Sequence, residues 1–307
     1  PHRPGASARA PDPLLPGAPD LIRKLGLGVL TALAFAGAAW ALPPVWVVRD
    51  RNSELVLFGS VHVLPPGLTW KPPALAKALK VADDLWFELP IDAETAALTG
   101  RLATQQGALA PDQSLFKLLS PEDSARLSRV ATAYAVSPAL LDRLQPWLAE
   151  IALAGGAYRK AGADAEGGVE QTIAAAAPPT AHLHAFETPQ EQIAMLAAGP
   201  MSEQLASLRE TLKEMEDEPD AFGVLVRAWA TGDVAALDHE ALEPIRKASP
   251  ALFKRLVTDR NARWAQALDA RLKGHGRTVV VVGVGHLIGP ESLPARLRAL
   301  GYSVTGP

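Results

Sequence analysis

Residues 55–62 read LVLFGSVH and residues 278–286 read TVVVVGVGH, so an apolar run ends in Gly-x-x-His near each end of the chain. Aliphatic and β-branched residues dominate both runs, which is typical of strands buried on both faces of a sheet. A loop, a segment with helical spacing and another apolar segment follow each motif. The sequence therefore predicts two related halves, each with the order strand, Gly-x-x-His, helix, strand.

The middle of the chain contains the start signals of several successive helices. Ser120-Pro121-Glu122-Asp123 and Ser137-Pro138 are helix starts, and Thr188-Pro189-Gln190-Glu191 is a capping box. Residues 181–186 (AHLHAF) predict one more strand in this region. We expect an α/β fold in which the two halves form a mixed sheet, with a large helical insert at about residues 100–270, all within a single domain covering residues 42–307.

Residues 1–41 have the order of a secretory signal peptide. Arg23 and Lys24 precede an apolar run from Leu25 to Ala39, and small residues follow at Ala39-Trp40-Ala41. The run would span roughly 22 Å as a helix, which is less than the hydrocarbon core of about 30 Å. We expect cleavage and a periplasmic or secreted protein; the alternative is an uncleaved single-pass membrane anchor.

Composition excludes several kinds of chemistry. Lysine and arginine total 30 against 33 acidic residues, and the net charge of −3 gives no basic field for nucleic acid. The chain has no cysteine, so a metal would be held by histidine, carboxylate or main-chain oxygen.

The two Gly-x-x-His motifs are the candidate site, because ligands of α/β sheets bind at the carboxyl ends of the strands. Neutral imidazoles of His62 and His286 could hold one divalent ion. Glu88 directly follows the apolar residues 85–87, which we expect to form a strand paired with the first one, and would ligate the ion or accept a proton from water. Each histidine could instead be a hydrogen-bonding loop residue, and Glu88 a helix cap or ion-pair partner.

Other side chains are weaker candidates. Glu170 and Glu187 lie at element boundaries and would either approach the ion or cap a helix, and Arg260 would stabilise an oxyanion or form an ion pair. His182 and His184 share one face of a strand and could form a second ligand pair.

An ordered set of motifs between residues 44 and 306 resembles the TraB/GumN family, relatives of the TIKI metalloproteases and, more distantly, of the ChaN and erythromycin-esterase proteins. The resemblance depends on residues 57–62, Glu88, Gln145-Pro146-Trp147, Gly168-Val169-Glu170, Phe186-Glu187-Thr188, Arg260-Asn261 and residues 282–289. It implies two related α/β halves with a helical insert. It also implies metal-dependent cleavage of peptides or proteins with manganese or cobalt, or alternatively zinc, and functional roles for His62, Glu88 and His286, followed by Glu170, Glu187 and Arg260.

The leading hypothesis is an exported metal-dependent hydrolase, acting as a peptidase on a peptide or protein substrate. One alternative is a non-catalytic envelope binding protein that holds haem or metal, or assists polysaccharide export. Another is a structural membrane-anchored protein that retains Leu25–Ala39.

Overall fold

A computed structural model describes residues 42–61, 63–163 and 168–307. The expected signal peptide at residues 1–41 and the candidate ligand His62 lie outside the described residues. Among the described residues, no helix combines the length and apolar character needed to cross a membrane.

A six-stranded mixed sheet with the order β4-β3-β5-β2-β1-β6 organises the fold. Strands β4, β3, β5 and β2 are parallel, whereas β1 is antiparallel to both of its neighbours. The bounds are β1 Val45–Arg49, β2 Ser53–Ser60, β3 Asp84–Phe87, β4 His182–Ala185, β5 Gly276–Gly283 and β6 Ser303–Thr305. The expected α/β class with a mixed sheet is confirmed.

The two predicted apolar runs, β2 and β5, are neighbours at the centre of the sheet. They pair in parallel register from Ser53 with Gly276 to Ser60 with Gly283. The valines at positions 279–282 are at most 1% exposed, as expected for a strand covered on both faces. The two Gly-x-x-His motifs therefore leave the same edge of the sheet from adjacent strands.

One expected pairing was wrong. The strand that precedes Glu88, β3, does not pair with β2; it lies between β5 and β4. The run of valines in β5 takes the central place between β2 and β3 because it presents apolar side chains to both faces. Glu88 is consequently next to the second Gly-x-x-His motif.

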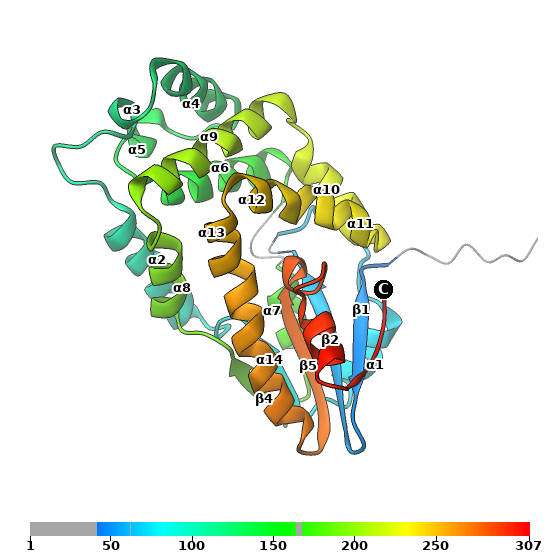
Figure 1. Cartoon of the computed structure of the whole chain (residues 1–307). Helices are drawn as coiled ribbons and strands as arrows, with labels where there is room; N and C mark the ends of the chain where they lie inside the picture. Colours follow the sequence, from blue (N-terminus) through cyan, green and yellow to red (C-terminus); the bar gives the residue numbers. More distant parts are fainter. Residues whose placement is uncertain (1–41, 62, 164–167) are drawn as a thin grey trace, which may run out of the picture. The chain divides into compact units, whose positions relative to one another are not determined.

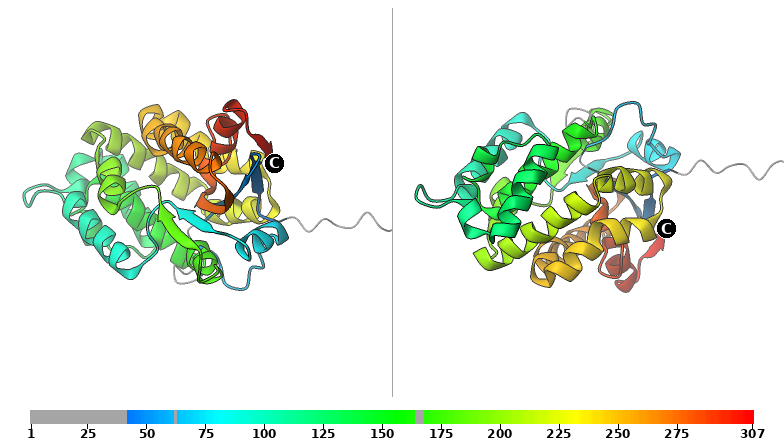
Figure 2. Two further views of the ribbon diagram at one scale, coloured as in Figure 1. Left: turned by 90° about the horizontal axis from the view of Figure 1, so that it is seen from below. Right: turned by 90° about the horizontal axis from the view of Figure 1, so that it is seen from above.

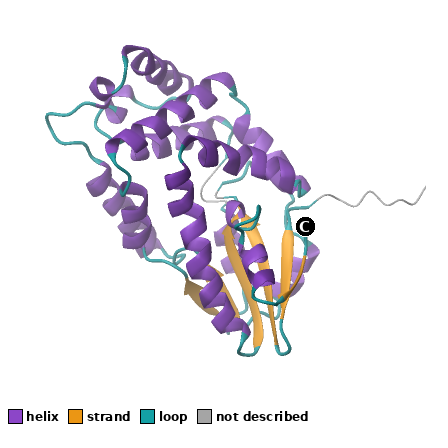
Figure 3. Ribbon diagram, in the orientation of Figure 1, coloured by secondary structure: helices purple, strands orange, loops and turns teal. Residues whose placement is uncertain are grey.

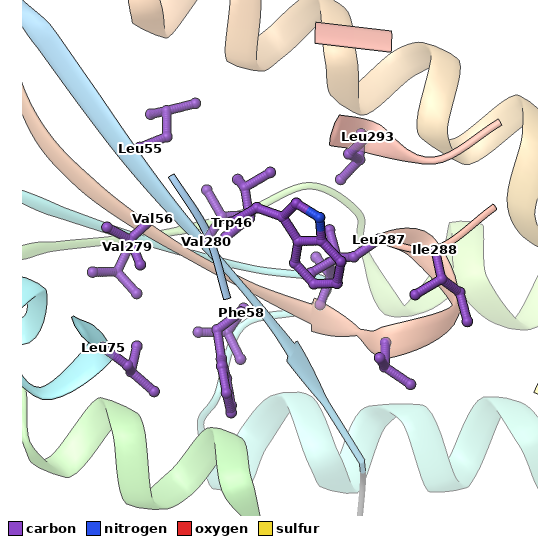
Figure 4. Packing of buried hydrophobic residues seen from close by; sticks show 14 of the residues in the cluster. Trp46, Leu55, Val56, Phe58, Leu75, Val279, Val280, Leu287, Ile288 and Leu293 are labelled. Atoms are coloured by element: carbon purple, nitrogen blue, oxygen red, sulfur yellow. The ribbon is translucent and has the colours of Figure 1, made fainter. Parts of the chain in front are cut away.

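Helices cover both faces of the sheet (Figures 1 and 2). Helices α14 (Asp259–Leu272) and α15 (Leu293–Ala299) lie on one face, and α1 (Pro73–Leu79) and α7 (Val169–Ala175) lie on the other. Figure 4 shows part of the resulting core, in which side chains from β1, β2 and β5 pack with Leu75 and Leu293 from the two helical layers.

The remaining helices form the insert between β3 and β5, and among its described residues β4 is the strand that joins the sheet (Figure 3). They are α2 Ala93–Gly107, α3 Leu115–Leu118, α4 Pro121–Ala133, α5 Pro138–Leu141, α6 Pro146–Lys160, α8 Pro189–Ala197, α9 Met201–Asp217, α10 Ala221–Thr231, α11 Val234–Leu237, α12 Glu243–Ala248 and α13 Pro250–Phe253. Part of the insert has its own hydrophobic core, which includes Leu127, Leu153 and Leu208.

The predicted helix starts are confirmed by their caps. The hydroxyls of Ser120 and Ser137 accept hydrogen bonds from main-chain amides three residues on, and Thr188 and Glu191 form the reciprocal capping box. Two π-helical turns, η1 (Asp238–Leu242) and η2 (Lys254–Thr258), interrupt the α-helical insert. The second directly precedes α14, the helix that supplies Arg260 to the site.

Candidate functional site

Glu88 and the second Gly-x-x-His motif are joined by a main-chain hydrogen bond. The amide of Gly283 donates to Oε1 of Glu88 at 2.7 Å. A Cβ atom at position 283 would lie 3.2 Å from the same oxygen, so glycine leaves room for the carboxylate to approach the strand end. The conformation of Gly283 is ordinary, with φ −50°, and close approach is therefore the reason for glycine here.

Arg260 is the centre of the site and is 7% exposed as a side chain. Its Nε and Nη2 donate to the two oxygens of Glu187 at 2.8 and 2.9 Å, which is a bidentate fork. Nη2 also donates to Oε2 of Glu88 at 2.5 Å. One guanidinium thus links the residues that follow β3 and β4 at the carboxyl edge of the sheet.

Burial alone would lower the pKa of the Arg260 guanidinium, but the charges of Glu88 and Glu187 and their hydrogen bonds raise it above its usual value. The arginine is therefore a permanent cation inside the protein. Removing either carboxylate would leave part of that buried charge uncompensated.

His286 completes the network, and its contacts define its tautomer. Nη1 of Arg260 lies 3.1 Å from Nε2 of His286. A guanidinium carries donors only, so Nε2 must be the acceptor and Nδ1 must carry the proton. Nδ1 then donates to Oδ1 of Asn261 at 2.7 Å.

Asn261 is fully buried and is itself held in one orientation. Its Nδ2 donates to the main-chain oxygens of Glu291 at 2.9 Å and of His286 at 3.3 Å. These two bonds assign the amide nitrogen, and Oδ1 therefore faces the imidazole. Asn261 fixes both the ring orientation and the proton position of His286.

Trp264, one turn after Arg260 on α14, covers the network with its indole. The guanidinium of Arg260 lies 4.5 Å from the indole centroid, and the rings of Trp264 and His286 are also 4.5 Å apart. Phe186 stacks on the indole at 4.9 Å. Contacts with aromatic rings thus restrict both the arginine and the histidine.

Gly59 and Ser60 of the first Gly-x-x-His motif lie beside this network. Gly59 is required by close approach, since a Cβ atom there would lie 2.8 to 2.9 Å from Val284. The indole of Trp229 donates to the main-chain oxygen of Gly59 at 2.7 Å. Ser60 is in register with Gly283 and donates to Oε1 of Glu170 at 2.6 Å, which places Glu170 at this first motif.

The structure therefore brings Glu88, Glu187, Arg260 and His286 into one hydrogen-bonded group, with Glu170 next to the neighbouring motif. Glu88 and Arg260 form an ion pair, which was the alternative stated for each of them. Arg260 also binds both oxygens of Glu187, whose Oε1 accepts from Arg263 at 3.3 Å. Metal binding and catalysis by these residues stay predictions.

His182 and His184 lie on β4, outside the network around Arg260. They pair with Asp84 and Trp86 along β4, and Nε2 of His184 lies 3.0 Å from Oδ1 of Asp84. Its ring stacks on Trp86 at 4.8 Å. In the part of the chain that the structure describes, no carboxylate contacts both histidines, so the hypothesis of a second ligand pair gains no support from a shared acid.

The donor atoms are of the types that bind divalent ions, and their separation is below the upper limit for two ligands of one ion. Nε2 of His286 and Oε1 of Glu88 are 3.9 Å apart. Two ligand atoms that each lie about 2.1 Å from one ion are separated by at most about 4.2 Å. The side-chain amide of Asn261, which accepts from Nδ1 of His286, is the kind of second-layer partner that orients metal-binding histidines. No group of three or more His, Cys, Asp or Glu side chains that could hold an ion occurs within the described residues, from which His62 is missing.

Sequence reasoning did not assign functions to Asn261 and Trp264. Asn261 directly follows Arg260, and Trp264 lies at i+4 from it, so all three project from neighbouring parts of α14. Trp264, Leu268 and Leu272 form an apolar stripe along the buried side of the helix. The polar pair Arg260-Asn261 next to that stripe was the signal that could have identified the site.

The fold and site define a class: an α/β protein with a helical insert and a buried carboxylate–arginine–histidine network at the carboxyl ends of a mixed sheet. The chain belongs to the TraB/PrgY/gumN family, whose profile matches residues 44–306. It is 27% identical to the uncharacterized protein YbaP of Escherichia coli K12 over 266 residues, which cover 86% of this chain and 96% of YbaP. An uncharacterized protein of Treponema pallidum is 24% identical over 260 residues, covering 81% of this chain and 78% of the relative.

Proposed function

We propose that this protein is a metal-dependent hydrolase in which His286, Glu88 and the histidine of the first motif, His62, hold a divalent ion. One observation carries the proposal: Nε2 of His286 and Oε1 of Glu88 lie 3.9 Å apart at the carboxyl edge of the sheet, with Nδ1 of the histidine anchored by Asn261. Manganese or cobalt is the proposed ion, with zinc as the alternative.

Each residue of the network has a definite task in this proposal. A divalent ion would supply Lewis-acid activation of water and of a carbonyl group. Glu88 would ligate with one oxygen or accept a proton, and the Gly283 amide keeps its carboxylate at the strand end. Asn261 keeps the acceptor nitrogen of His286 turned inward. Arg260 supplies a fixed positive charge for an anionic group that develops during hydrolysis.

The proposed substrate is a peptide or protein, and the support for this is the family resemblance. Export to the periplasm or outside the cell is likewise proposed from the composition of residues 1–41.

The test uses the purified full chain, reconstituted separately with Mn²⁺, Co²⁺ and Zn²⁺. Bound metal is measured by elemental analysis after gel filtration, and turnover is measured on a mixed peptide library. We expect about one ion per chain and cleavage, and loss of both in Glu88→Gln, His62→Gln and His286→Gln. The matched control is His239→Gln, because this histidine is 70% exposed and pairs with Glu243 on the insert.

Two results would contradict the proposal in different ways. Unaltered turnover in all three site variants would exclude the site. Metal bound through these residues without cleavage of any peptide would instead favour the binding-protein alternative.

A further inference from the structure

His286 offers one lone pair to the site, and Arg260 already uses it. Nδ1 of the ring is committed as a donor to Asn261, so Nε2 is the nitrogen that faces Glu88. Nη1 of Arg260 donates to this same Nε2 at 3.1 Å. An imidazole nitrogen has a single lone pair, and a guanidinium N–H and a metal ion cannot share it.

We infer that Arg260 and the divalent ion compete for Nε2 of His286, so that the ion enters by displacing Nη1 of Arg260 from the ring. The inference depends on the proposed metal site. Arg260 is then a positioning residue that holds the site together with its own positive charge, and the ion takes over part of that role.

The contacts of Arg260 show how this exchange can be local. The fork to Glu187 uses Nε and Nη2, and Glu187 is 3% exposed as a side chain. Nη1 has a second acceptor, the main-chain oxygen of Leu256 at 3.3 Å. Arg260 can therefore give up His286 while Glu187 and Leu256 keep it in place, and no buried carboxylate loses its cation.

The charge of the site also favours the exchange. Glu88 and Glu187 carry two negative charges, and Arg260 supplies one buried positive charge. Oε2 of Glu88 accepts from Arg260, whereas Oε1, the oxygen nearer to His286, accepts from the main chain. The two carboxylates thus carry one more charge than Arg260 supplies, and a second cation beside Oε1 would reduce that difference.

The experiment titrates the full chain with MnCl₂ in an isothermal calorimeter and compares Arg260→Met with Arg263→Met. Arg260→Met removes the competitor and keeps an apolar chain against Trp264, and we expect Mn²⁺ to bind about tenfold more tightly, because one charge-assisted hydrogen bond no longer has to break. Arg263 lies on the same helix and contacts Glu187, but it is 60% exposed. Its replacement should change the affinity by less than about threefold.

Equal tightening in both variants would indicate a general charge effect and overturn the inference, as would weaker binding in Arg260→Met. Loss of Arg260 leaves the negative charge of Glu187 buried without its arginine partner. The comparison is therefore repeated in protein that lacks this charge, with Glu187→Gln as the reference and Glu187→Gln/Arg260→Met as the test variant. The double variant should bind Mn²⁺ about tenfold more tightly than the single one.

A measurement on the unmodified protein needs no substitution at the site. During titration with ZnCl₂, the ¹⁵N signal of His286 Nε2 and the Nη1–H signal of Arg260, recorded at low temperature, should change together in one saturable step. A shift of His286 with an unchanged Arg260 signal overturns the inference but leaves the proposed function intact. Failure of the wild type and of Arg260→Met alike to bind Mn²⁺ or Zn²⁺ overturns both, whereas binding by Arg260→Met alone supports competition.

Discussion

Oδ1 of Asn261 lies 2.7 Å from Nδ1 of His286, and this contact determines which imidazole nitrogen faces Glu88. Asn261→Ala should weaken Mn²⁺ binding about 10- to 100-fold, the usual effect of losing an outer partner of a metal-binding histidine. Calorimetric titration of the variant measures this. Asn52→Ala, in the exposed turn between β1 and β2, is the control. Equal affinities in the two variants would show that Asn261 does not orient the ligand.

The fork between Arg260 and Glu187 predicts a large loss of stability when its charge is removed. Glu187→Gln leaves a buried guanidinium with one carboxylate fewer, and should reduce the free energy of unfolding by about 3–5 kcal/mol. The control is Glu54→Gln, which breaks the exposed pair with Arg49 and should cost about 1 kcal/mol or less. Urea denaturation compares them, and a loss no greater than that of the control contradicts the buried fork.

Close packing around Gly59 predicts that any larger residue there lowers the stability of the fold. A methyl group there would press on the backbone and side chain of Val284, so Gly59→Ala should lower the free energy of unfolding by about 1–3 kcal/mol. Gly100 lies inside α2, and a methyl group added to it would have nothing within 4 Å. Gly100→Ala should therefore raise stability by about 0.4–1 kcal/mol. Thermal unfolding with opposite signs for the two variants is the expected result, and a stabilised Gly59→Ala would refute the close contact.

Glu150 predicts a pH dependence of stability in the insert. Burial between α6 and α9 raises the pKa of its carboxyl to about 7, although hydrogen bonds from Thr211 and Ser207 oppose the shift. Between the unfolded value of 4.5 and about 7, the folded state binds more protons than the unfolded state, so stability must fall as pH rises through this window. The total loss is at most about 3 kcal/mol.

The measurement is urea unfolding from pH 4.5 to 8 for the wild type and Glu150→Gln. The variant should lack the decline that Glu150 causes, whereas Glu210→Gln, an exposed carboxylate on α9, should retain it. Parallel curves for the wild type and Glu150→Gln would show that this carboxyl ionises as easily in the fold as in the unfolded chain.

Local patterns were sufficient to predict the strands that end in the two motifs, since LVLFGSVH and TVVVVGVGH are continuous apolar runs. They were also sufficient for the helix starts at Ser120, Ser137 and Thr188, because caps depend on neighbouring residues. These features are decided within a few positions of the chain.

The order of strands was not predictable in this way. Placing β5 between β2 and β3 depends on contacts between segments that are far apart in the chain, and the propensity of each strand is the same in either arrangement. For the same reason, the sequence did not predict the hydrogen-bond network around Arg260. Arg260 and Glu88 are 172 positions apart, and neither the fork to Glu187 nor the Asn261 contact follows from local spacing.

The central claim is that Glu88 and His286 share one divalent ion. Anomalous diffraction at the manganese edge, from crystals of the full chain grown with MnCl₂, tests it directly. The expected result is one anomalous peak within about 2.3 Å of both Nε2 of His286 and a carboxylate oxygen of Glu88. A manganese peak at full occupancy elsewhere, with Arg260 still bonded to His286, would contradict the claim.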